Sequence, residues 1–313
     1  MRRETALRVA VFGGTGFVGG YVVDALLDAG HEPSLLVRAG SEHKVRQPER
    51  CRMIPGDLQD RDAIAAVLDG AHAAIYLVGI LRERRSAGIT FDALQYDGVR
   101  RCVDLAVAEG VRRFLLMSAN GVRDDGTPYE RSKLRAELYL KDSALAWTIM
   151  RPSIIFGDPR GAMEFCTQLR DEMVSPPLPA VSFFSGWRPS RGAAVMSPVH
   201  VEDVAAAFVA ALKGSEMLDR SFALGGPEIL SWSAILRRVA AACGRRKWIV
   251  PVPAGLVHAA AAVFDRFAWF PVTRDQLTML MRGNVVTDRA AFDLLGIEPR
   301  RMTMATLTYL GRR

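Results

Sequence analysis

The strongest constraint on the fold is a glycine-rich turn near the N-terminus. The stretch RVAVFGGTGFVGGYVVDALLDAGH, from Arg8 to His31, places five glycines in eight positions between an apolar run and a helical pattern. Glycine weakens helices and strands, so such a cluster indicates that something must approach the backbone closely. A Gly-x-Gly-x-x-Gly pattern that follows a strand and opens a helix is typical of a dinucleotide site, where the pyrophosphate binds free N–H groups of the helix N-terminus.

The spacing of this turn gives three of its glycines an expected task. Gly13 permits the tight turn out of the strand, Gly16 removes a Cβ that would obstruct the pyrophosphate, and Gly19 lets the helix pack closely. The residues of this turn that we expect at the cofactor are Gly13, Thr15, Gly16, Phe17, Val18 and Gly19. The alternative is a helix start that binds nothing.

The first half of the chain alternates short apolar runs with helical patterns. We expect strands at Arg8–Phe12, Ser34–Arg38, Cys51–Ile54, Ala73–Val78, Arg113–Met117 and Ala146–Met150. The clearest predicted helices are Gly16–Ala29, Asp60–Leu68, Phe91–Glu109 and Tyr129–Lys141. Apolar strands separated by helices are typical of a parallel sheet covered on both faces. We therefore predict an α/β fold with a Rossmann-type doubly wound parallel sheet, whose ligand lies at the carboxyl ends of the strands.

The second half of the chain has a different pattern. The segment Ser175–Pro198 is rich in Pro, Gly and aromatic residues, which excludes a regular helix or a central strand and predicts a long loop or a short β-ribbon over the carboxyl edge. From about Val199 the pattern indicates helices with one or two short strands, one of them at Ser221–Gly226. We predict a Rossmann domain at residues 1–155 and a smaller, mainly helical lobe at 156–313, parts of which return to the Rossmann sheet.

The distribution of charged residues and cysteines disfavours several kinds of function. The net charge is +7, but Lys and Arg are scattered, and only RERR (Arg82–Arg85) and GRRK (Gly244–Lys247) are dense. This disfavours nucleic-acid binding and leaves open a basic surface that faces anionic lipid or an acidic partner. The four cysteines stand far apart without a CxxC pair, which disfavours a metal site or a disulfide framework and fits a reducing compartment.

Hydropathy gives an expectation about location. Asp24 and Asp28 break the first apolar segment, and Asp265 and Arg266 interrupt the run Gly255–Phe270. No run approaches the ~18 uncharged apolar residues that a membrane span needs. We expect a cytoplasmic protein, with peripheral association at a membrane surface left open.

The end of the second predicted strand indicates which dinucleotide binds. An NAD site presents a carboxylate there to the ribose 2′-hydroxyl, whereas an NADP site presents an arginine to the 2′-phosphate. The sequence LLVRAGSEHK places Arg38 at the strand end, with no acidic residue beside it. We therefore favour NADP, with NAD as the alternative and an ordinary strand end as the other interpretation of Arg38.

Six sequence segments are spread over nearly the whole chain: GGTGFVGGYV, PGDLQD, YLVG, YERSK, MRPSIIFGDP and SPVHVEDVA. In order and spacing they resemble the short-chain dehydrogenase/reductase superfamily, in its extended or atypical branch. Within that branch the chain looks most like the group that contains the nucleotide-binding accessory subunit of respiratory complex I and its bacterial relatives. The resemblance is specific for the fold, good for the cofactor and poor for the substrate.

The resemblance implies further cofactor contacts. Asp57 would accept a hydrogen bond from the adenine amino group while Leu58 packs on the ring, although a carboxylate there can also cap the next helix. Gly79 would pass against the adenosine ribose, and Pro152 would lie near the nicotinamide. Ser118, which follows the fifth predicted strand, is also expected at the cofactor.

The candidate catalytic pair is Tyr129 and Lys133, in TPYERSKLRAE. Residues four apart share a helix face, so both side chains can reach the cofactor. Lys133 would bind the nicotinamide ribose and lower the tyrosine pKa from its ordinary value near 10, so that Tyr129 passes a proton while hydride moves. A solvated helix face is the alternative.

The sequence departs from the catalytic pattern at two places. The position that carries a Ser or Thr in the family's active enzymes falls on Ala119, with Ser118 one position too early. The Asn of the family's tetrad has no clear counterpart, since Gln95 and Asp97 are polar neighbours without a clean match. Cofactor binding is therefore a firmer prediction than turnover.

Other chemical side chains have structural interpretations. His200 and Asp203 are one helical turn apart and favour a cap or hinge over catalysis, and Arg151 favours an ion pair at a strand end. Phe183, Phe184 and Trp187 are substrate walls or core. The segment Pro251–Phe270 predicts a helix over the substrate lobe, or an amphipathic surface on a membrane.

Three functional hypotheses follow. The first is an NADP-binding oxidoreductase acting on a hydrophobic carbonyl, alcohol or quinone-like substrate through Tyr129 and Lys133. The second is a non-catalytic dinucleotide-binding accessory or assembly factor of a respiratory membrane complex. The third is a nucleotide-sugar epimerase or dehydratase, disfavoured because no sugar-diphosphate clamp is evident. We expect a monomer or homodimer, with dimers through Phe91–Glu109 and Tyr129–Lys141 in the family's manner.

Overall fold

A computed structural model describes residues 6–184, 194–255 and 274–311. Contacts divide the chain into two compact units. The first unit comprises Met1–Pro152, Glu202–Ala223 and Ala290–Ile297, and the second comprises Ser153–Val201, Leu224–Arg289 and Glu298–Arg313.

The first unit is built on a seven-stranded sheet. Its strands are β1 (Arg8–Phe12), β2 (Glu32–Val37), β3 (Arg52–Pro55), β4 (Ala73–Tyr76), β5 (Arg113–Met117), β6 (Ala146–Pro152) and β11 (Arg220–Leu224). Their order is β11-β6-β5-β4-β1-β2-β3, and β1 to β6 all pair in parallel. The chain crosses from β3 over β1 to β4, so the strand order reverses beside β1. The predicted doubly wound parallel sheet is confirmed.

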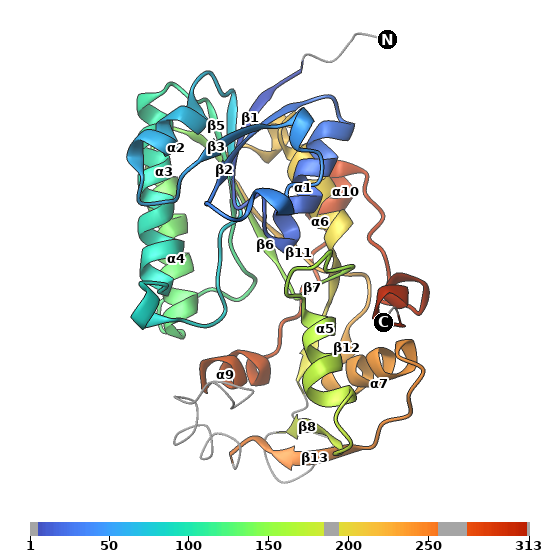
Figure 1. Cartoon of the computed structure of the whole chain (residues 1–313). Helices are drawn as coiled ribbons and strands as arrows, with labels where there is room; N and C mark the ends of the chain where they lie inside the picture. The colour runs from blue at the N-terminus through green and yellow to red at the C-terminus, as the bar shows by residue number, and fades with distance from the viewer. Residues whose placement is uncertain (1–5, 185–193, 256–273, 312–313) are drawn as a thin grey trace. The chain divides into compact units, whose positions relative to one another are not determined.

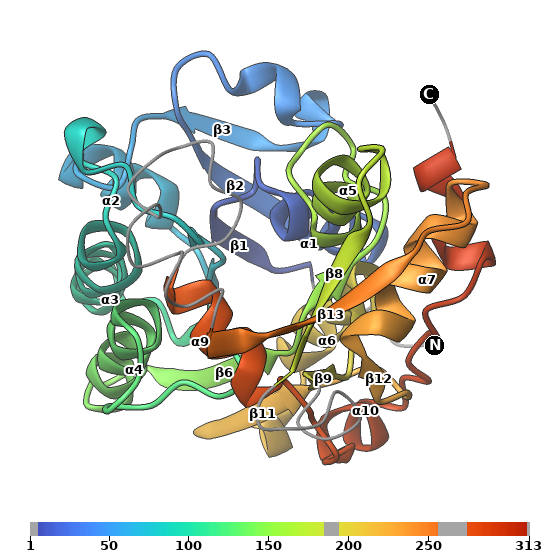
Figure 2. The ribbon, with the colours of Figure 1, turned by 90° about the horizontal axis from the view of Figure 1, so that it is seen from below.

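Helices cover both faces of this sheet. They are α1 (Phe17–Asp28), α2 (Arg61–Leu68), α3 (Asp97–Ala108), α4 (Pro128–Lys141), α6 (Val201–Ala211) and α10 (Ala290–Leu295), and a π-helical turn at Asp92–Tyr96 leads into α3. Figures 1 and 2 show α2, α3 and α4 on one face, with α1 and α6 on the other. The strands are apolar because both faces are covered, and Val9, Ala10, Val11 and Phe12 of β1 are fully buried.

Local sequence signals set the ends of two helices that position the site. The Asp60 side chain accepts a hydrogen bond from the Ala63 N–H at 2.9 Å and caps α2. Thr127 and Glu130 form a reciprocal capping box at the start of α4, which fixes where that helix begins. Asp57 is therefore not the cap of α2, and its carboxylate instead accepts the Gln59 N–H at 2.7 Å.

The second unit contains three two-stranded sheets and short helices. The strand pairs are β7 (Ile155–Phe156) with β10 (Val199–His200), β9 (Val195–Met196) with β12 (Leu230–Ser231), and β8 (Ala180–Phe184) with β13 (Ile249–Pro253). Its helices are α5 (Phe165–Leu169), continued by a π-helical turn at Arg170–Val174, then α7 (Trp232–Ala242), α9 (Arg274–Arg282) and a 3₁₀ segment at Ala305–Gly311. A separate core centres on Phe156, Ile235, Leu277 and Leu307.

One prediction for the second half needs correction, and another lies partly outside the described residues. The prediction of a helix over Pro251–Phe270 is wrong at its start, since Ile249–Pro253 is strand β13, paired in parallel with β8; residues 256–270 lie outside the described part. The long loop or short β-ribbon predicted at Ser175–Pro198 includes residues 185–193, which lie outside the described part; in the rest of the segment, β8 and β9 each pair with a strand from elsewhere in the chain. Proline is tolerated in β13 because this strand lies at a sheet edge.

Candidate functional site

The glycine turn joins β1 to α1 and has backbone geometry that only glycine satisfies. Gly13 has φ +93°, and a Cβ on it would lie 3.1 Å from the Val78 nitrogen, in the segment that follows β4. The Gly16 N–H donates to the Gly13 carbonyl at 3.0 Å, which closes the turn. A Cβ on Gly19 would lie 2.0 Å from that same carbonyl oxygen, so α1 can pack against the turn only if residue 19 lacks a side chain.

The start of α1 is open to an anion. Gly16 is the N-cap residue and is exposed, and no side chain within the described ranges caps the first turn of the helix. Val18 is buried, whereas Thr15 and Phe17 are half-buried beside the turn, with Phe17 edge-on to Tyr21. The first N–H groups of a helix need acceptors, and the helix dipole favours a negative charge there.

Six of the predicted cofactor residues lie at the carboxyl ends of parallel strands. Gly13 follows β1, Arg38 follows β2, Asp57 follows β3, Gly79 follows β4 and Ser118 follows β5. Pro152 is the last residue of β6. Because these strands are parallel neighbours, one edge of the sheet carries all six positions, and the switch point beside β1 lies among them.

Arg38 and Leu58 differ in how freely they could meet a ligand. Arg38 is exposed, and its guanidinium makes no hydrogen bond or ion pair within the part of the chain that the structure describes. Leu58 is buried in the core beside Gly98 of α3, and its carbonyl accepts a hydrogen bond from Arg101 Nε at 2.6 Å. The arginine is thus available to a phosphate, whereas the leucine offers a ligand little surface.

Lys133 projects from α4 into the carboxyl edge of the sheet. Its Nζ donates to the Met117 carbonyl at 2.9 Å, although only 3% of the residue is exposed. A Cβ on Gly79 would lie 3.3 Å from this Nζ, so the glycine backbone passes directly against the ammonium. The strand-end segment at Gly79 and the helix are therefore in contact through Lys133.

Gln95 connects the same two elements. It lies in the π-helical turn before α3, and its Nε2 donates to the Ile80 carbonyl at 2.8 Å. Its Oε1 accepts a hydrogen bond from the Ser132 hydroxyl, also at 2.8 Å. Ser132 precedes Lys133, so this buried amide holds α4 against the segment after β4. Asp97 forms a long, solvent-exposed ion pair with Arg100 at 3.9 Å and makes no other side-chain hydrogen bond or ion pair among the described residues.

Tyr129 stands one turn before Lys133 on α4. Its ring packs edge-on against Phe91, with 5.7 Å between centroids, and its hydroxyl makes no hydrogen bond within the described ranges. The phenol is thus fixed by its ring and leaves its O–H for another acceptor.

Burial dominates the acid–base properties of this pair. It raises the pKa of Tyr129 to about 12, and the negative charge of Glu130 acts in the same direction. It lowers the pKa of Lys133 to about 8, although Glu137 opposes that shift. The expectation that Lys133 lowers the tyrosine pKa is not met in this structure, because removing both groups from water disfavours their charged forms.

An ion pair anchors α4 to β6. Arg151 donates to both carboxylate oxygens of Glu137, with Nε–Oε1 at 2.9 Å, and Glu137 is fully buried. The predicted structural role of Arg151 is confirmed. Glu137 was not predicted from the sequence, although its position four residues after Lys133 places both on one face of the helix. Together with Ser132, it is a positioning residue that only the packing reveals.

At this edge of the sheet, the strand-end serine is an orphaned group that points to a ligand. The Ser118 hydroxyl is buried and has no hydrogen-bond partner in the described structure, while its N–H donates to the Met150 carbonyl at 2.8 Å. Ala119 follows it and supplies no hydroxyl. The Asn120 N–H donates to the Pro152 carbonyl at 2.9 Å and so ties the end of β5 to the end of β6.

The remaining candidate side chains are buried within one unit or the other, or they lie outside the described residues. His200 is in β10 with its ring edge-on to Phe156, 5.1 Å away, and Asp203 is buried. Phe183 and Phe184 are buried in β8, which makes them core; Trp187 lies outside the described residues. Within the described ranges, no group of three His, Cys, Asp or Glu side chains could hold a metal ion.

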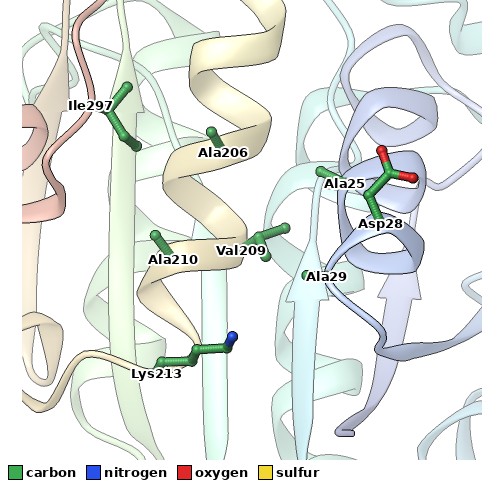
Figure 3. A pocket seen from close by; sticks show the side chains of 8 residues that line it. All are labelled: Ala25, Asp28, Ala29, Ala206, Val209, Ala210, Lys213 and Ile297. Atoms are coloured by element: carbon green, nitrogen blue, oxygen red, sulfur yellow. The ribbon is translucent and has the colours of Figure 1, made fainter. Parts of the chain in front are cut away.

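The cavity in Figure 3 is separate from this site. It lies between the C-terminal halves of α1 and α6, and its lining consists of Ala25, Asp28, Ala29, Ala206, Val209, Ala210, Lys213 and Ile297. The glycine turn is at the opposite end of α1, roughly 18 Å away for twelve residues of helix. None of the predicted site residues lines this cavity.

The residues at the carboxyl edge fit a nicotinamide dinucleotide. An open helix N-terminus suits the pyrophosphate, the exposed Arg38 suits a phosphate at the adenosine end, and Lys133 with the orphaned Ser118 hydroxyl suits polar groups at the other end. A Cβ on Gly13 or Gly19 would crowd the backbone of this cradle.

Comparison with known proteins agrees with this geometry. Residues 13–175 match the family model described as NAD(P)H-binding. A curated relative from Caulobacter vibrioides, named ceramide reductase, is 30% identical over 85% of this chain and 79% of that protein. A relative from Arabidopsis thaliana, named NADH dehydrogenase (ubiquinone) 1 alpha subcomplex subunit 9, mitochondrial, is 28% identical over 93% of this chain and 74% of that protein.

A solved structure shows the same fold. UDP-glucose 4-epimerase from Thermus thermophilus, in complex with NAD, is similar with a TM-score of 0.73 and 20% identity, over 97% of this chain and 98% of that chain. In the described part, no helix has the length and apolarity to cross a bilayer. The chain therefore belongs to the NAD(P)H-binding family, as an atypical member of the short-chain dehydrogenase/reductase superfamily in the group that includes complex I subunits.

Proposed function

We propose that this protein is an NADPH-dependent reductase of a hydrophobic carbonyl or quinone-like compound, with Tyr129 as the acid and Lys133 as the cofactor-binding cation. The observation that carries the proposal is the placement of both side chains on α4 at the edge where the glycine turn opens. Lys133 Nζ lies against the backbone of Gly79, and the Tyr129 hydroxyl has no hydrogen-bond partner in the described structure.

The protonation states favour reduction over oxidation. The bound dinucleotide would supply a hydride to the carbonyl carbon. With a pKa of about 12, Tyr129 holds its proton at neutral pH and donates it to the carbonyl oxygen, after which solvent restores the proton. With a pKa of about 8, Lys133 is mostly an ammonium at pH 7 and can donate to ribose hydroxyls while Met117 fixes its position.

The preference for NADPH rests on Arg38. Its free guanidinium stands just beyond β2, where Rossmann folds bind the adenosine ribose, and Arg binds phosphate oxygens through paired N–H groups. Glu42 lies further on, in a short 3₁₀ turn. We therefore expect NADPH to bind more tightly than NADH.

The substrate class is inferred from the names of the relatives. One relative is named ceramide reductase and another divinyl chlorophyllide a 8-vinyl-reductase, and both names refer to large hydrophobic compounds. We infer a lipid-like carbonyl or quinone as the first class to try, with the corresponding alcohol or quinol as the product. UDP-sugars are the control class, because the fold is shared with epimerases.

The test combines cofactor identification with turnover. The purified protein is mixed with NADPH and a panel of long-chain ketones, quinones and UDP-glucose, and absorbance at the reduced nicotinamide band is followed. The proposal predicts oxidation of NADPH with a hydrophobic substrate, and loss of this activity in Tyr129→Phe without loss of NADPH binding. Turnover of UDP-glucose without net oxidation would favour the epimerase hypothesis.

A second candidate function is that of an accessory factor for a respiratory membrane complex. Ala119 stands where the family's active enzymes carry a hydroxyl, and several relatives are named as subunits of NADH dehydrogenase (ubiquinone) or of NADH-ubiquinone oxidoreductase. NADPH that binds but never oxidises with any substrate, together with unchanged function of Tyr129→Phe in cells, would favour this role. It predicts peripheral association with such a complex, either as a monomer or as a homodimer.

A further inference from the structure

We propose that the second unit carries a docking surface for anionic membranes, formed by the two segments that lead into β8 and β13. The segments are Ser175–Pro179 and Gly244–Trp248, and we call them together the basic-aromatic edge. The inference is independent of the reaction proposed above, since this surface shares no residue with the nucleotide site.

Strand pairing brings the two segments together. β8 and β13 pair in parallel, with Ile249 opposite Ala180, so the residues that precede both strands lie at the same end of the pair (Figures 1 and 2). The Ala180 N–H donates to the Trp248 carbonyl at 2.8 Å, which fixes the junction. The two segments line a hollow of about 530 Å³.

Large apolar side chains are exposed on this edge. Trp248 is 83% exposed and Leu178 is 72% exposed, and Val250 of β13 is 44% exposed. Prolines 176, 177 and 179 stiffen the segment that carries Leu178. Exposed Trp and Leu on a rigid support are unfavourable in water and are typical of side chains that enter a membrane interface.

Cations surround these apolar groups. Residues 174–179 and 244–250 contain Arg245, Arg246 and Lys247 and no acidic residue. Arg245 donates to the Ser175 carbonyl at 2.8 Å, and Lys247 donates to the carbonyls of Val174 and Pro176, so these two cations also hold the segments together. Arg246 is exposed and its side chain makes no hydrogen bond or ion pair within the described part, which leaves its full charge for a partner.

The combination selects a lipid surface over other anionic partners. A nucleic acid or an acidic peptide would match the three cations but not the exposed leucine. An anionic bilayer matches both features, because its headgroups attract Arg and Lys while its interface accepts Trp and Leu. The nearest acidic residues along the chain are Glu172, which accepts a hydrogen bond from Gln168 at 2.9 Å, and Asp171, which is paired with Arg170 at 2.7 Å.

The test is co-sedimentation of the full chain with vesicles of phosphatidylcholine alone or mixed with phosphatidylglycerol. We expect binding to the mixed vesicles only, weakened by salt. Arg246→Glu should weaken it about 25-fold, since each cation contributes about fivefold near an anionic surface. Trp248→Ala should weaken it about tenfold by removing the apolar anchor.

Matched controls keep the outcome decisive. Arg112→Glu makes the same charge change at an exposed arginine of the first unit, and Met163→Ala removes an exposed apolar side chain elsewhere in the second unit. Both should bind vesicles as the wild type does. The proposal is overturned if the wild type does not bind anionic vesicles or binds neutral vesicles equally well. It is also overturned if Arg246→Glu and Trp248→Ala bind vesicles as the controls do, or if the wild type binds polyglutamate or RNA more tightly than anionic vesicles. All variants should bind NADPH normally, so a failure here is distinct from failure of the nucleotide site.

Discussion

The glycine turn and the face of α4 that carries Tyr129 and Lys133 belong to one unit but are specified in different ways. At the turn the backbone itself forms the site, and a single added carbon on Gly19 would lie 2.0 Å from a carbonyl oxygen. On α4 the side chains form the site, and their chemistry depends on burial that shifts the two pKa values in opposite directions. A backbone site can therefore be identified from spacing alone, whereas a side-chain site can be identified only when its neighbours are known.

The largest expected change in stability and NADPH binding comes from a substitution in the glycine turn, where the backbone forms the site. Gly19→Ala should destabilise the protein by about 3 kcal/mol or more and abolish NADPH binding, because α1 must move away from the turn. Gly20→Ala is the matched control, since a Cβ there meets no atom within 4 Å, and it should leave binding unchanged. Thermal unfolding and NADPH titration of both variants measure this difference. Equal behaviour of the two variants would show that close packing at residue 19 is not required.

The second largest expected change is in kcat, and it comes from a substitution on α4, where side chains form the site. Tyr129→Phe should reduce kcat for NADPH-dependent reduction about 100-fold, which is the scale of a lost general acid, while the Kd for NADPH stays the same. Steady-state kinetics with the best substrate found, beside direct titration of NADPH, separates the two quantities. A Tyr129→Phe enzyme with wild-type kcat would remove this residue from the chemistry.

Arg38 lies between these two cases, because its position is fixed by a strand end but its effect comes from a side chain. Arg38→Ala should weaken NADPH binding about thirtyfold, the scale of a lost charge-assisted contact, and leave NADH binding within about twofold. Calorimetric titration of both nucleotides into the variant supplies its own internal control. Parallel losses for NADPH and NADH would mean that the arginine does not contact the 2′-phosphate.

The smallest expected change is in the pH dependence of stability, and it tests whether Lys133 is buried. The pKa of this lysine is about 8 in the folded protein and near 10.5 when unfolded, so between these values the unfolded state binds more protons and stability rises with pH. The free energy of unfolding should increase by about 1 kcal/mol from pH 7 to pH 9, on account of this group. Above pH 10 the raised pKa of Tyr129 acts in the opposite direction.

Denaturant unfolding across this pH range, with Lys133→Met as the reference, isolates that contribution. The increase should be present in the wild type and absent from the variant. A wild-type curve that runs parallel to the variant's would indicate that Lys133 keeps an ordinary pKa and is better hydrated than its position implies.

The sequence predicts the sheet well because its signals are local. Apolar runs bounded by turns predicted β1 and β5 to the residue, and Asp60 marked the start of α2. The helix predicted at Phe91–Glu109 begins with a π-helical turn that presents Gln95 to Ser132, a contact between residues 37 positions apart. Periodicity carries no information about such contacts.

Errors concentrated in the second half, where pairing is long-range. β13 was hidden because Pro251 and Pro253 disfavour a strand, and only its partner β8, about 70 residues earlier, makes an edge strand possible. Glu137 was missed for a related reason. Its spacing from Lys133 was visible, but the ion pair with Arg151 depends on how α4 packs on β6.

The most direct test of the account is calorimetric titration of the purified protein with NADPH. The account predicts saturable binding at one site, tighter for NADPH than for NADH, retained in Gly20→Ala and lost in Gly19→Ala. If neither NADPH nor NADH produced heat of binding, or if Gly19→Ala and Gly20→Ala bound NADPH equally well, the claim that the backbone at the start of α1 holds the pyrophosphate would be contradicted.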